Sequence, residues 1–135
     1  MTASTPREIF LESVNRCVAN EGFIAAFYDR FLRSSSDIRH RFRFTDFERQ
    51  HRMLRRSLEL CAGATAGEPE ALQEIGERAR THSRAHLNIE PRLYTVWLET
   101  IVDTASDFDP DWSEGVEDAW RDILGHVIKH MIRHY

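Results

Sequence analysis

Apolar residues recur at spacings of three and four along nearly the whole chain, and no stretch alternates apolar and polar residues long enough to form a strand. Helix starts are also marked: Thr5–Glu8 and Thr45–Glu48 have the capping-box pattern, and Pro6, Pro69 and Pro91 stand where a helix opens. A chain of 135 residues with only 6 glycines and 4 prolines lacks the turns of a many-stranded protein. The sequence therefore predicts an all-α fold of six longer helices and one or two short ones.

The breaks expected between these helices are rich in Gly, Pro, Asn, Asp and Ser. They fall at residues 20–22, 34–37, 63–67, 88–91 and 107–113, with a short turn of helix over 38–42. The helix that opens at Pro69 is expected to turn one face inward, consisting of Leu72, Ile75, Ala79 and His82.

Length and composition exclude several classes of protein. The 135 residues are the length of one domain, so we expect residues 1–135 to fold as a single unit. With 18 Lys and Arg against 22 Asp and Glu, the net charge of −4 makes nucleic-acid binding a poor expectation. No signal-peptide pattern and no membrane-length apolar run is present, so we expect a soluble, cytoplasmic protein that does not bind a membrane. Cys17 and Cys61 lie on apolar helix faces and are expected to be reduced core residues.

The 7 histidines are the unusual feature of the composition, and they allow several kinds of site. Only Glu48–His51 has the Glu-x-x-His spacing, of which a two-metal carboxylate site needs two, and the common zinc motifs are absent. His126, His130 and His134 are spaced by four near the end of the last helix, which suits either the helix dipole or an adventitious metal. His82 continues an apolar helix face, where a histidine is usually a core residue.

The chain also contains a set of residues in the order and approximate spacing of a globin: Phe27–Tyr28, the segment 38–58, His82 and Ile89-x-Pro91-x-x-Tyr94. Over essentially its whole length it resembles the globins, most of all bacterial single-domain globins and the globin domains of bacterial sensors. The resemblance implies that residues 1–135 form a single globin domain, with its helices enclosing a haem b pocket.

On the proximal side, the resemblance implies that His82 is the iron ligand. His86 is its competitor; otherwise His86 either contacts a haem propionate or is a solvated residue. Phe42 resembles the phenylalanine that packs on the haem face, with Phe44 and Phe47 as local competitors for that role.

On the distal side, Tyr28 resembles a tyrosine whose hydroxyl donates a hydrogen bond to bound O2, although a core tyrosine bonded to a backbone carbonyl is the alternative. Gln50 takes the usual distal-gate position, one turn before the apolar Leu54. A shift of one residue would place His51 there, but it would also turn Arg55 toward the haem, and burying an unpaired arginine is costly. The remaining residues expected to contact haem are Ile75, Ala79, Ile89, Tyr94 and Trp97.

These identities imply reversible binding of O2, CO and NO, for storage, transport or buffering, rather than an enzyme. The alternatives are an NO dioxygenase or peroxidase-like enzyme that needs a separate reductase, a haem-based gas sensor, or a plain helical interaction domain. In flavohaemoglobins, a tyrosine–glutamate pair lies behind the proximal histidine. Tyr94 matches the tyrosine, but residues 130–135 hold no glutamate, which disfavours the enzyme. The sequence leaves monomer and homodimer equally open.

Overall fold

The computed structural model describes residues 4–135, which form seven α-helices and no strand. The helices are α1 (Pro6–Val18), α2 (Gly22–Arg33), α3 (Ser36–Arg41), α4 (Phe47–Thr65), α5 (Pro69–His82), α6 (Pro91–Phe108) and α7 (Glu114–Arg133). Six of them have 12 or more residues and α3 has 6, so the predicted all-α fold of six longer helices and one or two short ones is confirmed, with one short helix.

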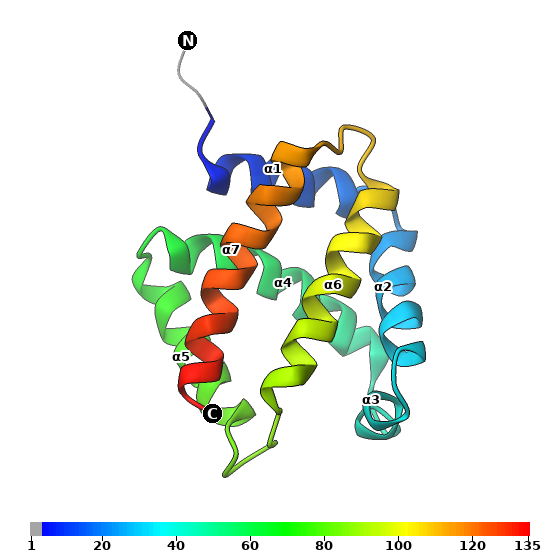
Figure 1. The fold of residues 1–135 in the computed structure, drawn as a ribbon, viewed down its shortest axis with the longest axis vertical. Coiled ribbons are helices and arrows are strands. Elements are labelled where there is room, and N and C mark those ends of the chain that lie inside the picture. The colour runs from blue at the N-terminus through cyan, green and yellow to red at the C-terminus, as the bar shows by residue number, and fades with distance from the viewer. Residues whose placement is uncertain (1–3) are drawn as a thin grey trace.

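Figure 1 shows how the helices surround one end of the molecule. The long helices α6 and α7 lie side by side, with α4 crossing behind them. Helix α1 crosses the upper end, α2 packs beside α6, and α3 lies at the foot of α2. Helix α5 packs on α4 and α7 at the lower end, close to the end of α7. Helix α3 lies at the lower end of the molecule, on the side away from α5.

Side-chain caps fix where several helices begin. Thr5 caps α1 by accepting a hydrogen bond from Glu8 N at 3.2 Å, as its capping box predicts. At α4 the predicted box is displaced by one residue, because Asp46 rather than Thr45 is the cap and accepts from Arg49 N at 3.4 Å. Asp and Thr both serve at this position, so the spacing alone did not decide between them.

The junction between α4 and α5 differs from the sequence prediction at two points. Helix α4 continues through Gly63 to Thr65, whereas a loop was expected from residue 63. A Cβ at Gly63 would lie 3.0 Å from the Cβ of Ala71, so the glycine lets α5 approach α4 closely. This close approach leaves room for the small Ala71 as the buried residue. Leu72, which was expected to point inward, is 50% exposed.

The upper end of the molecule is joined by a buried polar network. Asp109, between α6 and α7, accepts from Ser13 Oγ at 2.6 Å and from Arg16 Nε at 2.6 Å. Ser13 Oγ in turn accepts from Trp120 Nε1 at 2.8 Å, and the Trp120 ring packs edge-on against Phe10. The network links α1 to α7 and to the turn before it, away from the lower end.

Both cysteines are free and buried, as the sequence predicts for reduced core residues. Burial raises the pKa of Cys17 and of Cys61 to about 12. Within residues 4–135, no helix combines the length and the apolar character that crossing a membrane requires.

Candidate functional site

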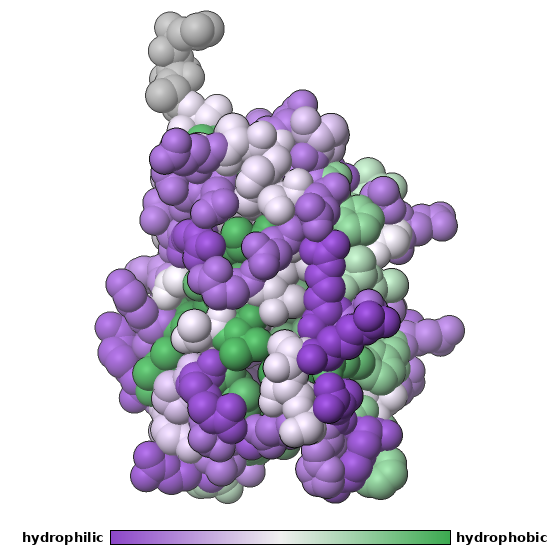
Figure 2. All heavy atoms as spheres, turned by 45° about the vertical axis from the view of Figure 1, so that its right-hand side comes forward, coloured by the Kyte–Doolittle hydropathy of each residue, from purple (hydrophilic) through white to green (hydrophobic). Residues whose placement is uncertain are grey.

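A cavity of about 510 Å³ lies at the lower end of the molecule, between α2 and α7. All helices except α1 contribute to its lining, which is mostly apolar. Two lining residues, Met53 and Leu87, are themselves 41% and 59% exposed, so the cavity opens to solvent beside them. Figure 2 shows apolar surface gathered in hollows between polar segments on one face of the molecule. The size and lining are those of a site for a mainly apolar ligand.

Six of the residues predicted to contact a cofactor do line this cavity: Phe42, Leu54, Ile75, Ile89, Tyr94 and Trp97. They come from four helices or the segments next to them, and they lie as far apart in the sequence as Phe42 and Trp97. The inward faces that helical periodicity predicts therefore meet at one cavity rather than in separate parts of the core.

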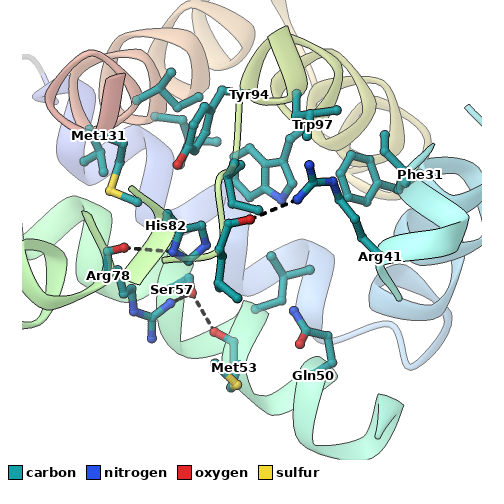
Figure 3. A pocket seen from close by; sticks show the side chains of 18 of the residues that line it. Phe31, Arg41, Gln50, Met53, Ser57, Arg78, His82, Tyr94, Trp97 and Met131 are labelled. Atoms are coloured by element: carbon teal, nitrogen blue, oxygen red, sulfur yellow. Dashed lines mark hydrogen bonds between the residues drawn. The ribbon is translucent and has the colours of Figure 1, made fainter. Parts of the chain in front are cut away.

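His82 is the last residue of α5, and its imidazole enters the cavity (Figure 3). Its Nδ1 lies 2.8 Å from the carbonyl oxygen of Arg78, one turn earlier. Because a carbonyl oxygen only accepts, Nδ1 is the donor, and Nε2 of the neutral ring keeps its lone pair. Burial lowers the pKa of His82; the bond to Arg78 raises it, and the Arg78 charge lowers it again. The ring is therefore held neutral and oriented, which is the form that binds a metal.

Tyr28 and Gln50 line another side of the cavity, on α2 and α4. The Gln50 amide Nε2 donates to Tyr28 Oη at 3.1 Å, and the hydroxyl donates to the Gln50 backbone carbonyl at 3.4 Å. Burial raises the pKa of Tyr28 to about 12, and the Gln50 bond opposes that shift, so the phenol keeps its proton at neutral pH. Two hydrogen-bond donors therefore stand together at an otherwise apolar wall.

His51 lies outside the cavity lining and stacks on the Tyr28 ring, with centroids 5.2 Å apart and planes 9° apart. Leu54 is buried and lines the cavity, whereas Arg55 is exposed. This is the register of α4 that the cost of burying Arg55 favoured. His51 supports the Tyr28 ring from behind instead of facing the ligand space.

Three other predicted residues are not in the cavity. Phe44 is 89% exposed in the turn after α3, where the Arg43 guanidinium covers its ring, which corrects its assignment to the cofactor. Ala79 is buried, but it borders a smaller pocket beside His130 on α7, since it lies off the His82 face of α5. His86 is exposed in the turn after α5, because the helix ends at His82 and the one-turn relation between the two histidines is lost.

The cavity is also lined by two arginines that the sequence pattern did not indicate, Arg41 and Arg78. Arg78 precedes His82 by one helical turn, and this spacing could have placed it beside the imidazole. Its guanidinium donates to Ser57 Oγ, which in turn donates to Met53 O at 2.7 Å. Arg41 Nη1 donates to Leu87 O at 3.1 Å, but its Nε is buried and has no hydrogen-bond partner among residues 4–135.

The fold and the site together define a globin-like helical protein with one oriented histidine in an apolar cavity. No family model matches the chain, and no curated protein does. Among solved structures, the chain is similar to a protein from Pseudomonas aeruginosa, described as structurally highly homologous to a human hemoglobin. The TM-score is 0.92 and the identity 32%, over 97% of this chain and 98% of that one. The chain therefore belongs to the same globin-like family as that bacterial protein.

A globin-like fold implies a haem cofactor, and the residues of the cavity fit one. The lone pair of His82 Nε2 is a suitable axial ligand for iron. The mostly apolar lining suits the porphyrin ring. The buried Arg41 Nε, which lacks an acceptor, stands where a negatively charged group of the ligand would provide one.

Proposed function

We propose that this protein binds haem b through His82 and reversibly binds O2, and likewise CO and NO, in the cavity. The carrying observation is the pair of His82 nitrogens: Nδ1 is bonded to Arg78 O at 2.8 Å, which leaves Nε2 free for a metal. When bound, the haem iron supplies an open coordination position for a diatomic gas.

His82 is positioned by its own helix. Because the acceptor for Nδ1 is a carbonyl of α5, the imidazole can rotate only at the cost of a buried hydrogen bond. An axial ligand fixed in this way keeps one tautomer and one direction, and the carbonyl also increases its basicity.

Tyr28 and Gln50 supply polarity where a gas ligand would lie. At 3.4 Å, the bond from the Tyr28 hydroxyl to the Gln50 carbonyl is long and weak, so the proton can be redirected to a ligand at little cost. The Gln50 amide, 3.1 Å from the phenol oxygen, holds that oxygen in place. In an apolar space each such donor stabilises a partial negative charge by about 1–3 kcal/mol.

The residues around these donors are mostly apolar, so a ligand that covers the opening would leave few sites for water beside them. Leu54 is buried, and Phe42 and Trp97 pack against the same core. A dry pocket strengthens the hydrogen bonds inside it and slows loss of the ligand. Long retention of a gas suits storage or buffering, and we propose this role in preference to catalysis.

The experiment that tests the proposal is reconstitution of the purified protein with haemin. We expect a Soret band and, after reduction, the spectrum of a histidine-ligated haem that takes up O2 and CO reversibly. His82→Gly should lose this spectrum and regain it with added imidazole. His86→Gly, on the exposed turn, is the matched control and should behave as the wild type. A protein that takes up no haem, or an unchanged spectrum in His82→Gly, would overturn the proposal. Rapid NO consumption with a supplied reductase would show that the protein is an enzyme instead.

A further inference from the structure

Arg41 has a hydrogen-bonding capacity that the rest of the chain does not meet. Within residues 4–135, its Nε is the buried side-chain nitrogen or oxygen that has no hydrogen-bond partner. A buried N–H without an acceptor is costly, and more so on a charged group. Such an atom in the lining of a cavity points to a ligand that completes it.

The nearby acidic residue does not fill this role. Asp37 Oδ1 forms an ion pair with Arg41 Nε at 3.6 Å, a distance too long for a hydrogen bond. The other Asp37 oxygen is 3.0 Å from Arg92 Nη2, so this carboxylate is already paired with α6. Arg41 Nε is therefore ion-paired but still lacks a hydrogen-bond acceptor among residues 4–135, and a second anion can supply one.

The position of Arg41 matches the opening of the cavity. Its Nη1 reaches from α3 to the Leu87 carbonyl, and Figure 3 shows the guanidinium directed inward along that bond. The exposed apolar residues Leu87 and Met53 line the same cavity. A ligand with an apolar body and an anionic edge would cover these two side chains and place its charge beside Arg41.

We propose that Arg41 binds a carboxylate of the cavity's ligand, which is a haem propionate on the function proposed above. A guanidinium suits this role because it is always charged and its planar N–H groups match carboxylate geometry. Arg78 also lines the cavity, but its guanidinium donates to Ser57, so Arg41 is the anchor.

The test compares haem with haem dimethyl ester, in which both carboxylates are blocked. Release of each from the reconstituted protein to an excess of apomyoglobin is followed by absorbance, for the wild type, Arg41→Gln, Arg41→Lys, Arg78→Gln and Arg43→Gln. Arg43 is the matched control, because it is exposed and its Nη1 donates to His40 O outside the cavity. Circular dichroism checks that each variant is folded.

We expect Arg41→Gln to release haem about tenfold faster than the wild type, as loss of one charge-assisted hydrogen bond requires. The release rate of Arg41→Lys should fall between those of the wild type and Arg41→Gln, and Arg43→Gln should match the wild type. The dimethyl ester should be released at the same rate from all variants. Unchanged haem release from Arg41→Gln overturns the assignment, as does equal acceleration with the ester or an effect confined to Arg78→Gln. Failure of the wild type to take up either compound overturns the proposed function as well, so the two failures are distinct.

Discussion

The Tyr28 hydroxyl donates only a weak hydrogen bond, because its acceptor, the Gln50 carbonyl, is 3.4 Å away. The same oxygen is held more firmly as an acceptor, at 3.1 Å from the Gln50 amide. The O–H bond of Tyr28 can therefore turn toward another acceptor while the phenol oxygen stays in place. Tyr28 is therefore positioned to serve a ligand rather than to satisfy a core hydrogen bond.

Replacement of Tyr28 by phenylalanine should accelerate O2 dissociation from the reconstituted protein by roughly ten- to a hundredfold, because one donor of about 1–3 kcal/mol is lost. Stopped-flow displacement of O2 by CO measures the rate. Tyr94→Phe is the control, since Tyr94 is a second tyrosine that lines the cavity, on α6, and the hydrogen bonds of Gln50 are made with Tyr28. An unchanged rate in Tyr28→Phe would show that another group is the dominant donor.

The sequence predicts the site residues on long amphipathic helices better than it predicts Arg41. His82 and Leu54 lie on periodic apolar faces, so their inward direction follows from spacing. Arg41 lies in a helix of only 6 residues, where a charged side chain is expected to face solvent. Its buried Nε depends on how α3 meets the segment after α5, and this packing is tertiary.

At the scale of elements, the segment that follows α5 is held by Tyr135, which lies two residues beyond the end of α7. Arg84 N donates to Tyr135 O at 2.9 Å, and the Arg84 guanidinium lies 4.8 Å from the Tyr135 ring centroid. The Tyr135 hydroxyl donates to Asn88 Oδ1, and Asn88 has a φ of 52°, in the left-handed region. Tyr135 thereby fixes the turn that begins directly after His82.

Tyr135→Ala should loosen this turn without unfolding α1. We expect faster amide hydrogen exchange across residues 83–89, with unchanged exchange in α1 at the other end of the molecule. Hydrogen exchange followed by mass spectrometry resolves the two segments. Tyr135→Phe, which keeps the ring beneath Arg84, should give an intermediate effect. Equal exchange in wild type and Tyr135→Ala would mean that the turn is held by its own backbone bonds.

Element boundaries were predicted to within a few residues, and the errors have one physical source. Asp46 and Thr45 are both suitable caps, Gly63 is a normal loop residue, and Leu72 fits the helical period as well as Ala71 does. The close packing of α5 on α4 decides between these options for Gly63 and Leu72. Periodicity reports local preference and cannot include the distance to a partner helix.

At the scale of the whole molecule, the polar network at the upper end stabilises the fold, and the cavity at the lower end is the candidate binding site (Figure 1). Burial raises the pKa of Asp109, but its bonds to Arg16, Ser13 and Asp111 N outweigh this, so the pKa lies below its ordinary value. A depressed carboxyl pKa stabilises the fold above the unfolded pKa, and this contribution is lost as pH falls through the folded value.

Asp109→Asn should therefore lower the free energy of unfolding by about 2 kcal/mol at pH 7, because charge-assisted bonds to Arg16 are lost. The difference from the wild type should begin to narrow below about pH 4, where the carboxyl of the unfolded chain takes up its proton, and should be lost as pH falls through the depressed pKa of the folded state. Urea unfolding at several pH values measures both effects. Asp111→Asn, at an exposed carboxylate 3.7 Å from Arg16, should have little effect at any pH. A difference that stays constant down to pH 3 would rule out this charge as the cause.

The cavity lowers the stability of the ligand-free protein, because the side chains that line a space of about 510 Å³ lack packing partners on one side. A ligand that fills it binds the folded state alone and stabilises it by about 4 kcal/mol when present at a thousand times its dissociation constant. For a chain of this size, that corresponds to a rise in melting temperature on the order of 10 °C or more. Thermal melting of the apo and haem-loaded protein, followed by circular dichroism, tests this expectation. His82→Gly should show a smaller rise at the same haem concentration, since the iron–histidine bond adds to burial of the porphyrin. Equal melting temperatures with and without haem would show that the lining side chains pack against one another in the apo protein. The cavity would then not be a haem site.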